Sequence, residues 1–451
     1  MNALKRIGMV GMASFFWVLS IKGLGAEPIR TLTFSDVISL VTTQNLTLKQ
    51  SAQQVALSEA DVTVARAASH PDLNLSLSPT QNFNRTLDQT TYQTENQQQA
   101  SIRASASSSI TLYDGGANRA AYQAASHNLL SSNETWSDTR QRVIYTAASQ
   151  FLQVSQDVEL IRVAKENLVA QQEQFKRIEA FFEEGVRSRA DVLQQQSAVA
   201  QAELQVLTAE RNWTVDQLQL KQTLGLDPTE AIAVLPLKDT SDAPMPNNNV
   251  DDAIAARADV AAQEQQLMVA ELGIQEAKAG YKPTLSLSGN LGTDYSSSNN
   301  LSGFQDQMFS VNPSFSVGLT LSFPIFDRSR TESNVKRAQV QLTQQELTMA
   351  QLKQAVAFEV ELASADYHSA MKQREVREST EEAAREALAA MEARYNTGAA
   401  TLAELSQVRA TYVDAASGLV EARYETMIRY LDMARTMGRI ELAVNTLTGG
   451  I

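Results

Sequence analysis

The stretch from Ala117 to Glu184 limits what this chain can fold into, because it contains neither glycine nor proline and is rich in alanine, glutamine, glutamate, leucine and valine. Those residues keep most of their rotamer freedom in a helix, so the composition predicts one continuous α-helix. At about 1.5 Å per residue the helix would be roughly 100 Å long, several times the width of an ordinary domain. The rest of the chain has to be arranged around a helix of that length.

Apolar residues recur every seven residues at two positions of the repeat in this stretch. This heptad pattern indicates that the helix packs along a partner helix with a left-handed supercoil. The residues of the pattern are Ile144, Ala147, Phe151, Val154, Val158, Ile161, Leu168, Phe175 and Phe182. The partner follows directly, since Val186–Leu224 is again free of glycine and proline. Taken alone, the pattern also fits a coiled-coil spacer. We predict a long helical hairpin over residues 117–226.

The chain carries one motif twice. Three pairs of landmarks lie 213 residues apart: Phe182–Gly185 and Tyr395–Gly398, Leu112–Asp114 and Ile325–Asp327, and Gly225 and Gly438. Constant spacing across the chain indicates internal duplication. We predict a first repeat over 26–226 and a second over 250–440, with its own long hairpin at 328–438. The linker 227–249 contains four prolines, and residues 441–451 form a tail.

In each repeat a shorter helix, Thr33–His70 or Asp251–Tyr281, is expected to lead into two strands and to stack end to end with the returning arm of the hairpin. Apolar and polar residues alternate at four places, which predicts strands at about 72–84, 100–113, 284–296 and 313–326. One face carries Leu73, Leu75, Leu77, Ile102, Ile110, Leu285, Leu287, Phe315, Val317, Leu319, Leu321 and Phe323. Serine, threonine and asparagine occupy the other face. The polar segments Arg85–Gln99 and Thr293–Asn312 are expected to be loops.

Two interpretations compete for these strands. In the first, the apolar face packs on a soluble core, but the long flanking helices would run away from such a sheet rather than over it. In the second, the apolar face contacts lipid and the polar face lines water, and strands of about ten residues suit the hydrocarbon thickness. Four strands cannot close a barrel, and lipid forbids open sheet edges. The second interpretation, which we favour, therefore requires several chains.

The N-terminus has the pattern of an export signal over residues 1–25, because Lys5 and Arg6 precede an apolar run from Ile7 to Ile21. Without that signal the net charge would fall from −13 to about −16, which argues against nucleic acid as a partner. The chain has no cysteine, which excludes disulfides, thiolate metal sites and lipid attachment at a cysteine.

The sequence gives little support for an enzyme. His70, His127 and His368 have no second histidine at ligand spacing, so no metal site is expected. There is no phosphate-binding glycine loop and no nucleophile elbow, and Asp114–Gly116 is explained by a turn between strand and helix. We predict no catalytic residue and no cofactor.

Together these features resemble the TolC-like outer membrane efflux proteins over nearly the whole mature chain. The residues that carry the resemblance are Leu112–Gly116, Phe323–Asp327, Phe182–Val186 with Asp191–Leu193, and Tyr395–Gly398 with Glu404–Leu405. The resemblance implies a mixed α and β fold, in which long helices form an α-helical barrel. It also implies that four antiparallel strands per chain contribute to a 12-stranded transmembrane β-barrel in a homotrimer. Arg257–Val260 departs from the frequent Arg-Pro-Asp-Leu pattern, so that helix start is expected to differ locally.

The resemblance further implies an outer membrane protein with a periplasmic helical extension. Such a protein passes substrates outward in a tripartite efflux or type I secretion system, together with an inner-membrane transporter and a periplasmic adaptor. The alternatives are a periplasmic adaptor or a coiled-coil spacer. Two hairpins and two lipid-type strand pairs argue against an adaptor, and a spacer would not need polar strand faces.

The hairpin turns are the expected adaptor-docking tips. Their residues are Gly185, Val186, Arg187 and Ser188 in the first turn and Gly398, Ala399, Ala400, Thr401 and Leu402 in the second. The resemblance places Asp191 and Glu404 near the periplasmic gate, where three-fold symmetry would make a carboxylate ring that attracts cations. Gln407 replaces a frequent second acid, Ala400 replaces a basic latch, and Tyr395 can donate a hydrogen bond to a carboxylate such as Asp191. We expect a weak charge ring and an easily opened gate, unless Glu404 is only a solvated acid.

Overall fold

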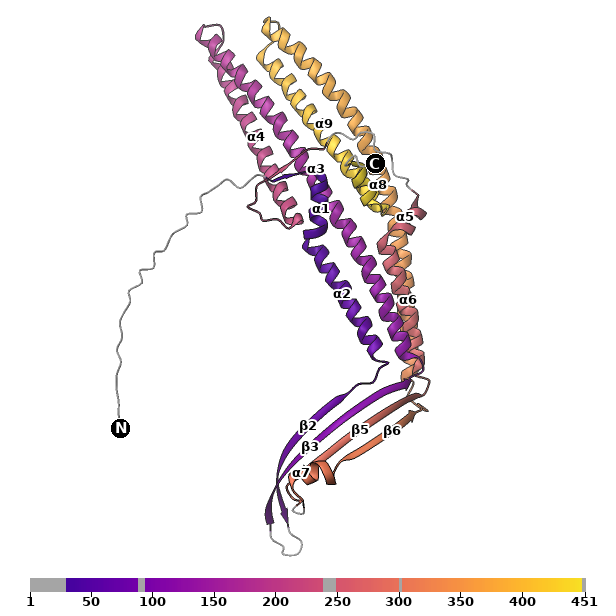
Figure 1. The fold of residues 1–451 in the computed structure, drawn as a ribbon. Coiled ribbons are helices and arrows are strands. Elements are labelled where there is room, and N and C mark those ends of the chain that lie inside the picture. The colour runs from indigo at the N-terminus through magenta and orange to yellow at the C-terminus, as the bar shows by residue number, and fades with distance from the viewer. Residues whose placement is uncertain (1–29, 88–93, 238–248, 300–301, 448–451) are drawn as a thin grey trace, which may run out of the picture.

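The computed structural model describes residues 30–87, 94–237, 249–299 and 302–447. These residues form a long rod of helices that ends in a four-stranded sheet (Figure 1). The expected export signal and part of the linker lie outside the described residues.

Two helical hairpins run side by side along the rod (Figure 1). The first joins α3 (Ala117–Glu183) to α4 (Arg189–Leu224), and the second joins α8 (Arg330–Asn396) to α9 (Leu402–Thr436). The helices α3 and α8 have 67 residues each, and they continue past their partners to the sheet. Because no glycine or proline interrupts either one, the backbone hydrogen-bond ladder is continuous over that length.

The duplicated aspartates at the strand-to-helix joints hold the starts of the two long helices. Asp114 accepts hydrogen bonds from the backbone N–H groups of Gly116 at 2.9 Å and Asn118 at 2.6 Å. Asp327 accepts one from the N–H of Thr331 at 2.8 Å. These N–H groups lie at the N-cap or in the first turn, where no carbonyl of the helix can reach them, so the side chains supply the missing acceptors.

The single short helix expected in each repeat is two helices in the structure. In the first repeat α1 (Phe34–Gln44) and α2 (Leu46–Ala67) are separated at Asn45, whose side chain accepts a hydrogen bond from the N–H of Leu48 at 3.0 Å. In the second repeat α5 (Val250–Ala256) and α6 (Ala258–Ala279) are separated at Arg257, whose backbone is extended. The prediction of one uninterrupted helix was therefore wrong in both repeats, because one residue at each break leaves the helical conformation.

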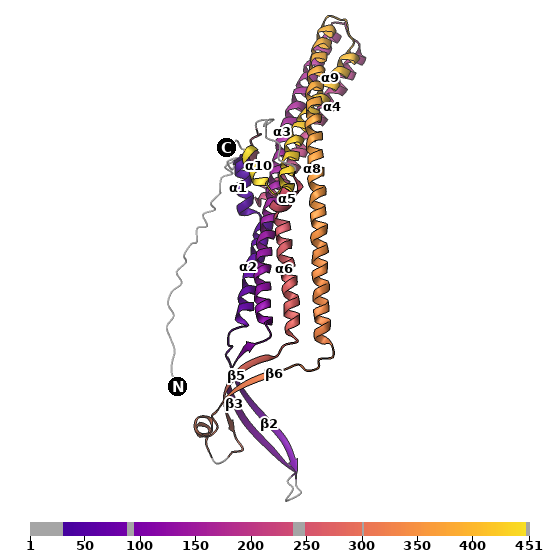
Figure 2. The same cartoon turned by 90° about the vertical axis from the view of Figure 1, so that its right-hand side faces the viewer.

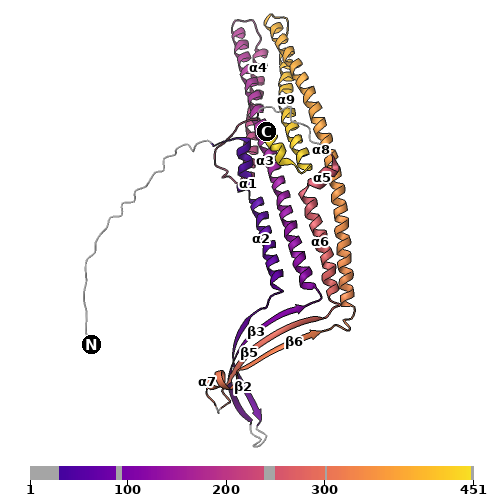
Figure 3. The same ribbon diagram turned by 45° about the vertical axis from the view of Figure 1, so that its right-hand side comes forward.

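The breaks lie where the short helices meet the returning arms end to end. Asn45 donates a side-chain hydrogen bond of 2.8 Å to the carbonyl of Thr223, at the end of α4. In the second repeat Gly438 follows α9 at φ +69°, and a Cβ atom there would lie 2.9 Å from the carbonyl oxygen of Ala256. The pairs α4 with α2 and α9 with α6 thus lie roughly in line beside the long helices (Figure 3).

The sheet has the order β2-β3-β5-β6 and all its pairs are antiparallel. Its strands are β2 (Asn74–Leu87), β3 (Thr94–Tyr113), β5 (Thr284–Ser296) and β6 (Ser314–Ser322). The first hairpin extends into the segment Arg85–Gln99, which was expected to be a loop. The other expected loop, Thr293–Asn312, contains the end of β5, a short helix α7 (Phe304–Asp306) and a π-helical turn η1 (Gln307–Val311).

The strand β6 ends earlier than expected. It was placed at 313–326 but stops at Ser322, two residues before Pro324. Proline has no N–H to donate to a strand ladder, so the pairing stops near it.

The register gathers the predicted apolar residues on one face, because cross-strand partners point to the same side of a sheet. Ile110 pairs with Leu287, and Leu287 pairs with Leu319 on its other side. The residues of this face within the strands are Leu75, Leu77, Ile102, Ile110, Leu285, Leu287, Phe315, Val317, Leu319 and Leu321. Leu73 lies just before β2 and Phe323 just after β6. The apolar face is open to the surroundings in this chain, with Leu75 83% and Leu319 64% exposed.

The hydrophobic core lies halfway along the rod, where segments distant in sequence meet α3 and α9 (Figure 2). Phe34 of α1 packs edge-on against Phe151 of α3, with ring centroids 5.3 Å apart. A helix α10 (Ile440–Leu447) begins one residue before the expected tail, and β4 (Ile232–Val234) lies within the expected linker. The strand β4 pairs in parallel with β1 (Arg30–Leu32). Among the described helices, none combines the length and the hydropathy needed to cross a membrane.

Candidate functional site

The two hairpin turns, at the end of the rod opposite the sheet, are the candidate functional site (Figure 1). Each turn contains a glycine just past the end of the long helix: Gly185 at φ +77° and Gly398 at φ +78°. Apart from the glycine and its two neighbours in the chain, no atom lies within 4 Å of where a Cβ would stand at either position. Glycine is therefore favoured by the positive φ angle and not by a lack of room for a side chain. A glycine can end a helix in the left-handed conformation at low energetic cost.

Both predicted gate acids form capping boxes at the start of the returning helices. Ser188 accepts a hydrogen bond from the N–H of Asp191, and Asp191 accepts bonds from the backbone N–H of Ser188 at 3.2 Å and from its hydroxyl at 3.0 Å. Thr401 and Glu404 repeat this arrangement at 2.7 and 2.9 Å. The acid six residues after each tip glycine is therefore a helix cap in this chain.

The hydrogen bonds of its cap change the acidity of Glu404. The backbone N–H of Thr401, and then its hydroxyl, hold the pKa of this carboxyl below its usual value. Glu404 is exposed, and Gln407 one turn later is exposed too. Glu404 is thus ionised at neutral pH and open to the surroundings, which a charge ring would require.

The second turn has a small core that holds the two hairpins together. Tyr395, Ala400 and Leu402 are buried there with Ile178 and Leu405. A second contact joins the tips, because the guanidinium carbon of Arg187 stands 5.1 Å from the centroid of the Tyr395 ring.

Most of the expected docking residues remain at the surface, and two do not. The exposed residues are Gly185, Val186, Ser188, Gly398, Ala399 and Thr401, while Arg187 is half-buried on the tyrosine. Ala400 and Leu402 are 9% and 4% exposed. They belong to the interior of the tip rather than to its surface.

The expected hydrogen bond from Tyr395 to a carboxylate is not formed in this structure. Its hydroxyl is buried and has no hydrogen-bond partner among the described residues. The carboxylate of Asp191 instead accepts hydrogen bonds from Ser188. The contact between the first tip and Tyr395 is made instead through the ring, by Arg187.

Arg409 is a residue of this site that the sequence analysis missed. It is 8% exposed and pairs with Glu392 of α8 at 2.6 Å. A signal was present, since Leu402, Leu405 and Arg409 fall on one helix face at offsets of three and four, and a cation on an apolar stripe is unusual.

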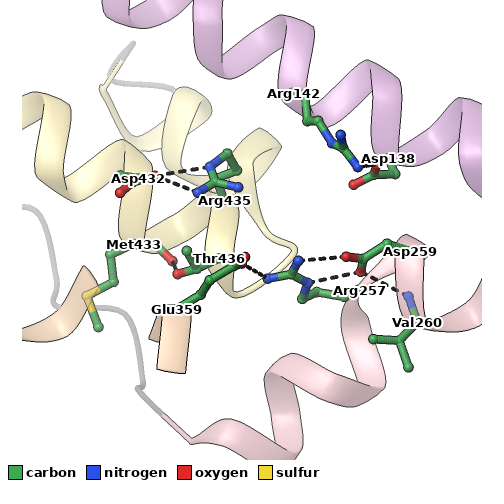
Figure 4. A network of polar contacts seen from close by, with 10 residues as sticks. All are labelled: Asp138, Arg142, Arg257, Asp259, Val260, Glu359, Asp432, Met433, Arg435 and Thr436. Carbon is green, nitrogen blue, oxygen red and sulfur yellow. Dashed lines mark hydrogen bonds and ion pairs between the residues drawn. The ribbon is translucent and has the colours of Figure 1, made fainter. Parts of the chain in front are cut away.

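A second polar cluster, centred on Arg257, joins α6 to α8 (Figure 4). Arg257 contacts Asp259 through two nitrogens, at 3.0 and 2.6 Å, and Glu359 of α8 at 2.6 Å. Burial opposes ionisation of Asp259, but the hydrogen bonds and charge of Arg257 outweigh burial and keep the pKa of Asp259 below its usual value. The cluster crosslinks the start of α6 to α8.

No group of three or more histidine, aspartate and glutamate residues suited to a metal ion occurs in the described part of the chain. His127 makes a 2.8 Å hydrogen bond with Gln265 of α6, so its role in this structure is in packing between helices.

Comparison with known proteins matches both repeats. The model of a family described as outer membrane efflux protein matches residues 37–226 and 249–439. The pyoverdine export outer membrane protein OpmQ of Pseudomonas aeruginosa is 25% identical over 406 residues, which cover 87% of this chain and 82% of that protein. Its counterpart from Pseudomonas putida is 28% identical over 67% of this chain, but the match spans only 63% of that protein. The outer membrane protein TolC of Salmonella enteritidis is 25% identical over 40% of this chain and 38% of its own length.

Solved structures agree on the fold. A crystal structure of CusC superposes with a TM-score of 0.78 at 17% identity, over 90% of this chain and 92% of that one. The Campylobacter jejuni CmeC outer membrane channel gives 0.78 at 17% identity, over 90% of this chain and 86% of its own. The predicted fold class, long helices with a four-stranded antiparallel sheet in a duplicated chain, is confirmed.

Proposed function

This chain belongs to the outer membrane efflux protein family, and we propose that it is the outer membrane channel of a tripartite efflux or type I secretion system. The observation that carries the proposal is the sheet, whose register gathers leucine, isoleucine, valine and phenylalanine on one open face. The other face carries mainly serine, threonine and asparagine, with Ser76 and Ser105 in hydrogen-bond contact at 2.7 Å. A water-filled barrel in lipid has this division.

Closure of such a barrel comes from further copies of the chain. Among the described strands, β2 pairs only with β3 and β6 only with β5, so both outer strands carry unpaired backbone groups. Lipid cannot satisfy those groups, and a four-stranded sheet is too narrow to close on itself. Three copies supply twelve strands, and the long helices of the same three copies form the periplasmic tunnel.

The tips form the docking surface for a periplasmic adaptor, which connects the channel to an inner-membrane transporter. Val186 and Ala399 are exposed residues of the two turns, and the turns lie at the end of the rod opposite the sheet (Figure 1). Asp191 and Glu404 follow in the first turn of each returning helix and line the periplasmic gate. Tyr395 is part of the same gate.

Export through the inner membrane uses residues 1–25 as a cleaved signal. N-terminal sequencing of the protein recovered from outer membranes tests this assignment. A mature N-terminus near residue 26 is expected, and recovery of a chain that still begins at Met1 contradicts it.

Membrane fractionation followed by planar bilayer recording tests the channel itself. The expected result is an outer membrane species that migrates as a trimer until heated and that conducts ions when purified. A periplasmic adaptor or a spacer would instead be recovered from the periplasm or the inner membrane and would not conduct. Deletion of the gene should abolish export of the substrate of the cognate transporter.

A further inference from the structure

A cavity of about 160 Å³ lies behind the tips, between the two hairpins. Its wall is made by three helices: α3 contributes Glu173, Gln174 and Arg177, α8 contributes Glu392 and Tyr395, and α9 contributes Arg409. Both repeats of the chain therefore border the cavity. It is several times larger than one water molecule, which occupies about 30 Å³ of liquid.

Three buried polar atoms in this wall have no hydrogen-bond partner among the described residues. They are Nε2 of Gln174, Oη of Tyr395 and Nη1 of Arg409. These three residues are 6%, 7% and 8% exposed. Buried polar groups in folded proteins are nearly always paired, so three in one wall need a common explanation.

All three of these groups can donate a hydrogen bond, and two of them can only donate. The acidic side chains of the wall do not satisfy them. Glu392 is engaged by the other terminal nitrogen of Arg409 at 2.6 Å, and Glu173 faces Arg177 at 3.9 Å along α3. The charges of the two acids and the two arginines in the wall therefore cancel, while three hydrogen-bond donors remain without an acceptor.

We propose that this cavity binds a small monovalent anion of chloride or acetate size, which accepts hydrogen bonds from Gln174, Tyr395 and Arg409. One negative charge suits the wall, because Glu173 and Glu392 oppose a divalent anion at short range. The bound anion joins α3 of the first repeat to α8 and α9 of the second. Near the tips it is a third link between the hairpins, beside the Arg187–Tyr395 contact and the small core at the second tip.

Anion-dependent unfolding of the purified full-length protein tests the proposal independently of export and conductance. Chloride is exchanged for gluconate, a much larger anion than chloride or acetate, at constant ionic strength and pH. A ligand that binds only the folded state raises the melting temperature with its concentration. The expected result is a melting temperature that rises with chloride or acetate, and an unchanged melting temperature overturns the proposal.

Two variants and one control separate this site from a general salt effect. Tyr395→Phe and Gln174→Leu each remove an unpartnered donor without breaking a contact seen in the structure, so both should fold and lose most of the chloride dependence. Tyr122→Phe removes a hydroxyl from an exposed tyrosine of α3 and should retain the full dependence. Equal chloride dependence in all four proteins overturns the proposal.

Crystals grown with bromide in place of chloride give a direct view of the site. Anomalous density is expected in the cavity, within hydrogen-bonding distance of the three donors, in the parent protein and not in Gln174→Leu. Ordered water alone in the parent cavity would mean that solvent satisfies the donors, and would contradict the proposal.

Discussion

The interior of the first hairpin strongly changes the pKa of one buried carboxyl group, that of Asp157. Asp157 is 4% exposed on α3, and its Oδ2 has no hydrogen-bond partner among the described residues. Burial, and after it the neighbouring carboxyl of Asp216, raises the pKa of Asp157 to about 7. Both causes disfavour the ionised form in the folded state.

The sign of the resulting pH dependence follows from linkage. Below the unfolded pKa of 3.8 both states hold the proton, and Asp157 contributes nothing to pH dependence. As pH rises from about 4 to about 7, the unfolded state ionises and the folded state does not, so stability falls. Above pH 7 the whole penalty is present.

Asp157→Asn should therefore stabilise the protein by about 1–3 kcal/mol at pH 8 and leave it nearly unchanged at pH 4. Thermal unfolding across this pH range measures the difference. Asp216→Asn should give a smaller gain, because it removes only the second cause. If Asp157→Asn destabilised the protein equally at both values, ionisation of Asp157 would not be the reason.

The two faces of the sheet can be tested at neighbouring residues of β6. Leu319→Arg places a cation on the apolar face and should cost about 2–4 kcal/mol near the middle of a bilayer, so insertion should fall. Thr320→Arg lies on the polar face and should insert normally while changing conductance. Heat-modifiable trimers in outer membranes are the readout, and equal insertion of both variants would refute the assignment of faces.

At the scale of the element, the seam of α3 follows the seven-residue pattern only in its first part. Ile144, Ala147, Phe151 and Val154 are fully buried, whereas Leu168 and Phe175 are half-buried and Phe182 is exposed. Toward the tip the buried residues are Val163, Gln174 and Ile178. A straight helix drifts relative to a seven-residue repeat, so the seam moves to other positions as partners change.

Capping at the second tip has a measurable stability contribution. Thr401→Ala removes the hydroxyl acceptor for the N–H of Glu404 and should cost about 0.5–2 kcal/mol, seen as faster hydrogen exchange in the first turn of α9. Thr411→Ala, in the middle of α9, is the matched control. It should be neutral or slightly stabilising, because alanine is the better helix former there.

On the scale of the whole molecule, three-fold assembly would convert one exposed carboxylate into a ring. Glutamine serves in a capping box as glutamate does, so Glu404→Gln removes the charge and keeps the helix start. We expect trimers of this variant to lose part of their cation preference and their block by divalent cations in bilayer recordings. Unchanged selectivity would mean that Glu404 is a solvated cap only.

Adaptor docking is tested at Ala399, an exposed residue of the second tip. Ala399→Glu should abolish export while trimers and conductance persist, because a charged side chain would meet the partner surface. Ala389→Glu, exposed on α8 away from the turn, should export normally. Arg187→Glu is the less selective variant, since it also removes the contact with Tyr395. Normal export by Ala399→Glu would place docking elsewhere.

The sequence by itself determined the features that depend on neighbouring residues. The absence of glycine and proline determined the length of α3. The tip glycines determined where the chain reverses direction in each hairpin. The alternation of apolar and polar residues determined which side chains share a face of the sheet. These signals act over one turn or one strand pair, so they can be read without a partner. The duplication added the order in which the elements recur.

Only the tertiary structure decided what depends on residues far apart in the chain. At the break between α1 and α2, the side chain of Asn45 donates a hydrogen bond to the carbonyl of Thr223. The strand Arg30–Leu32 forms because Ile232–Val234 lies beside it and pairs with it. The burial of Arg409, with Glu392 as its partner, follows from the packing of α9 on α8 and α3. No local pattern specifies such contacts, because their free energy arises only when distant segments are brought together and their polar groups lose water.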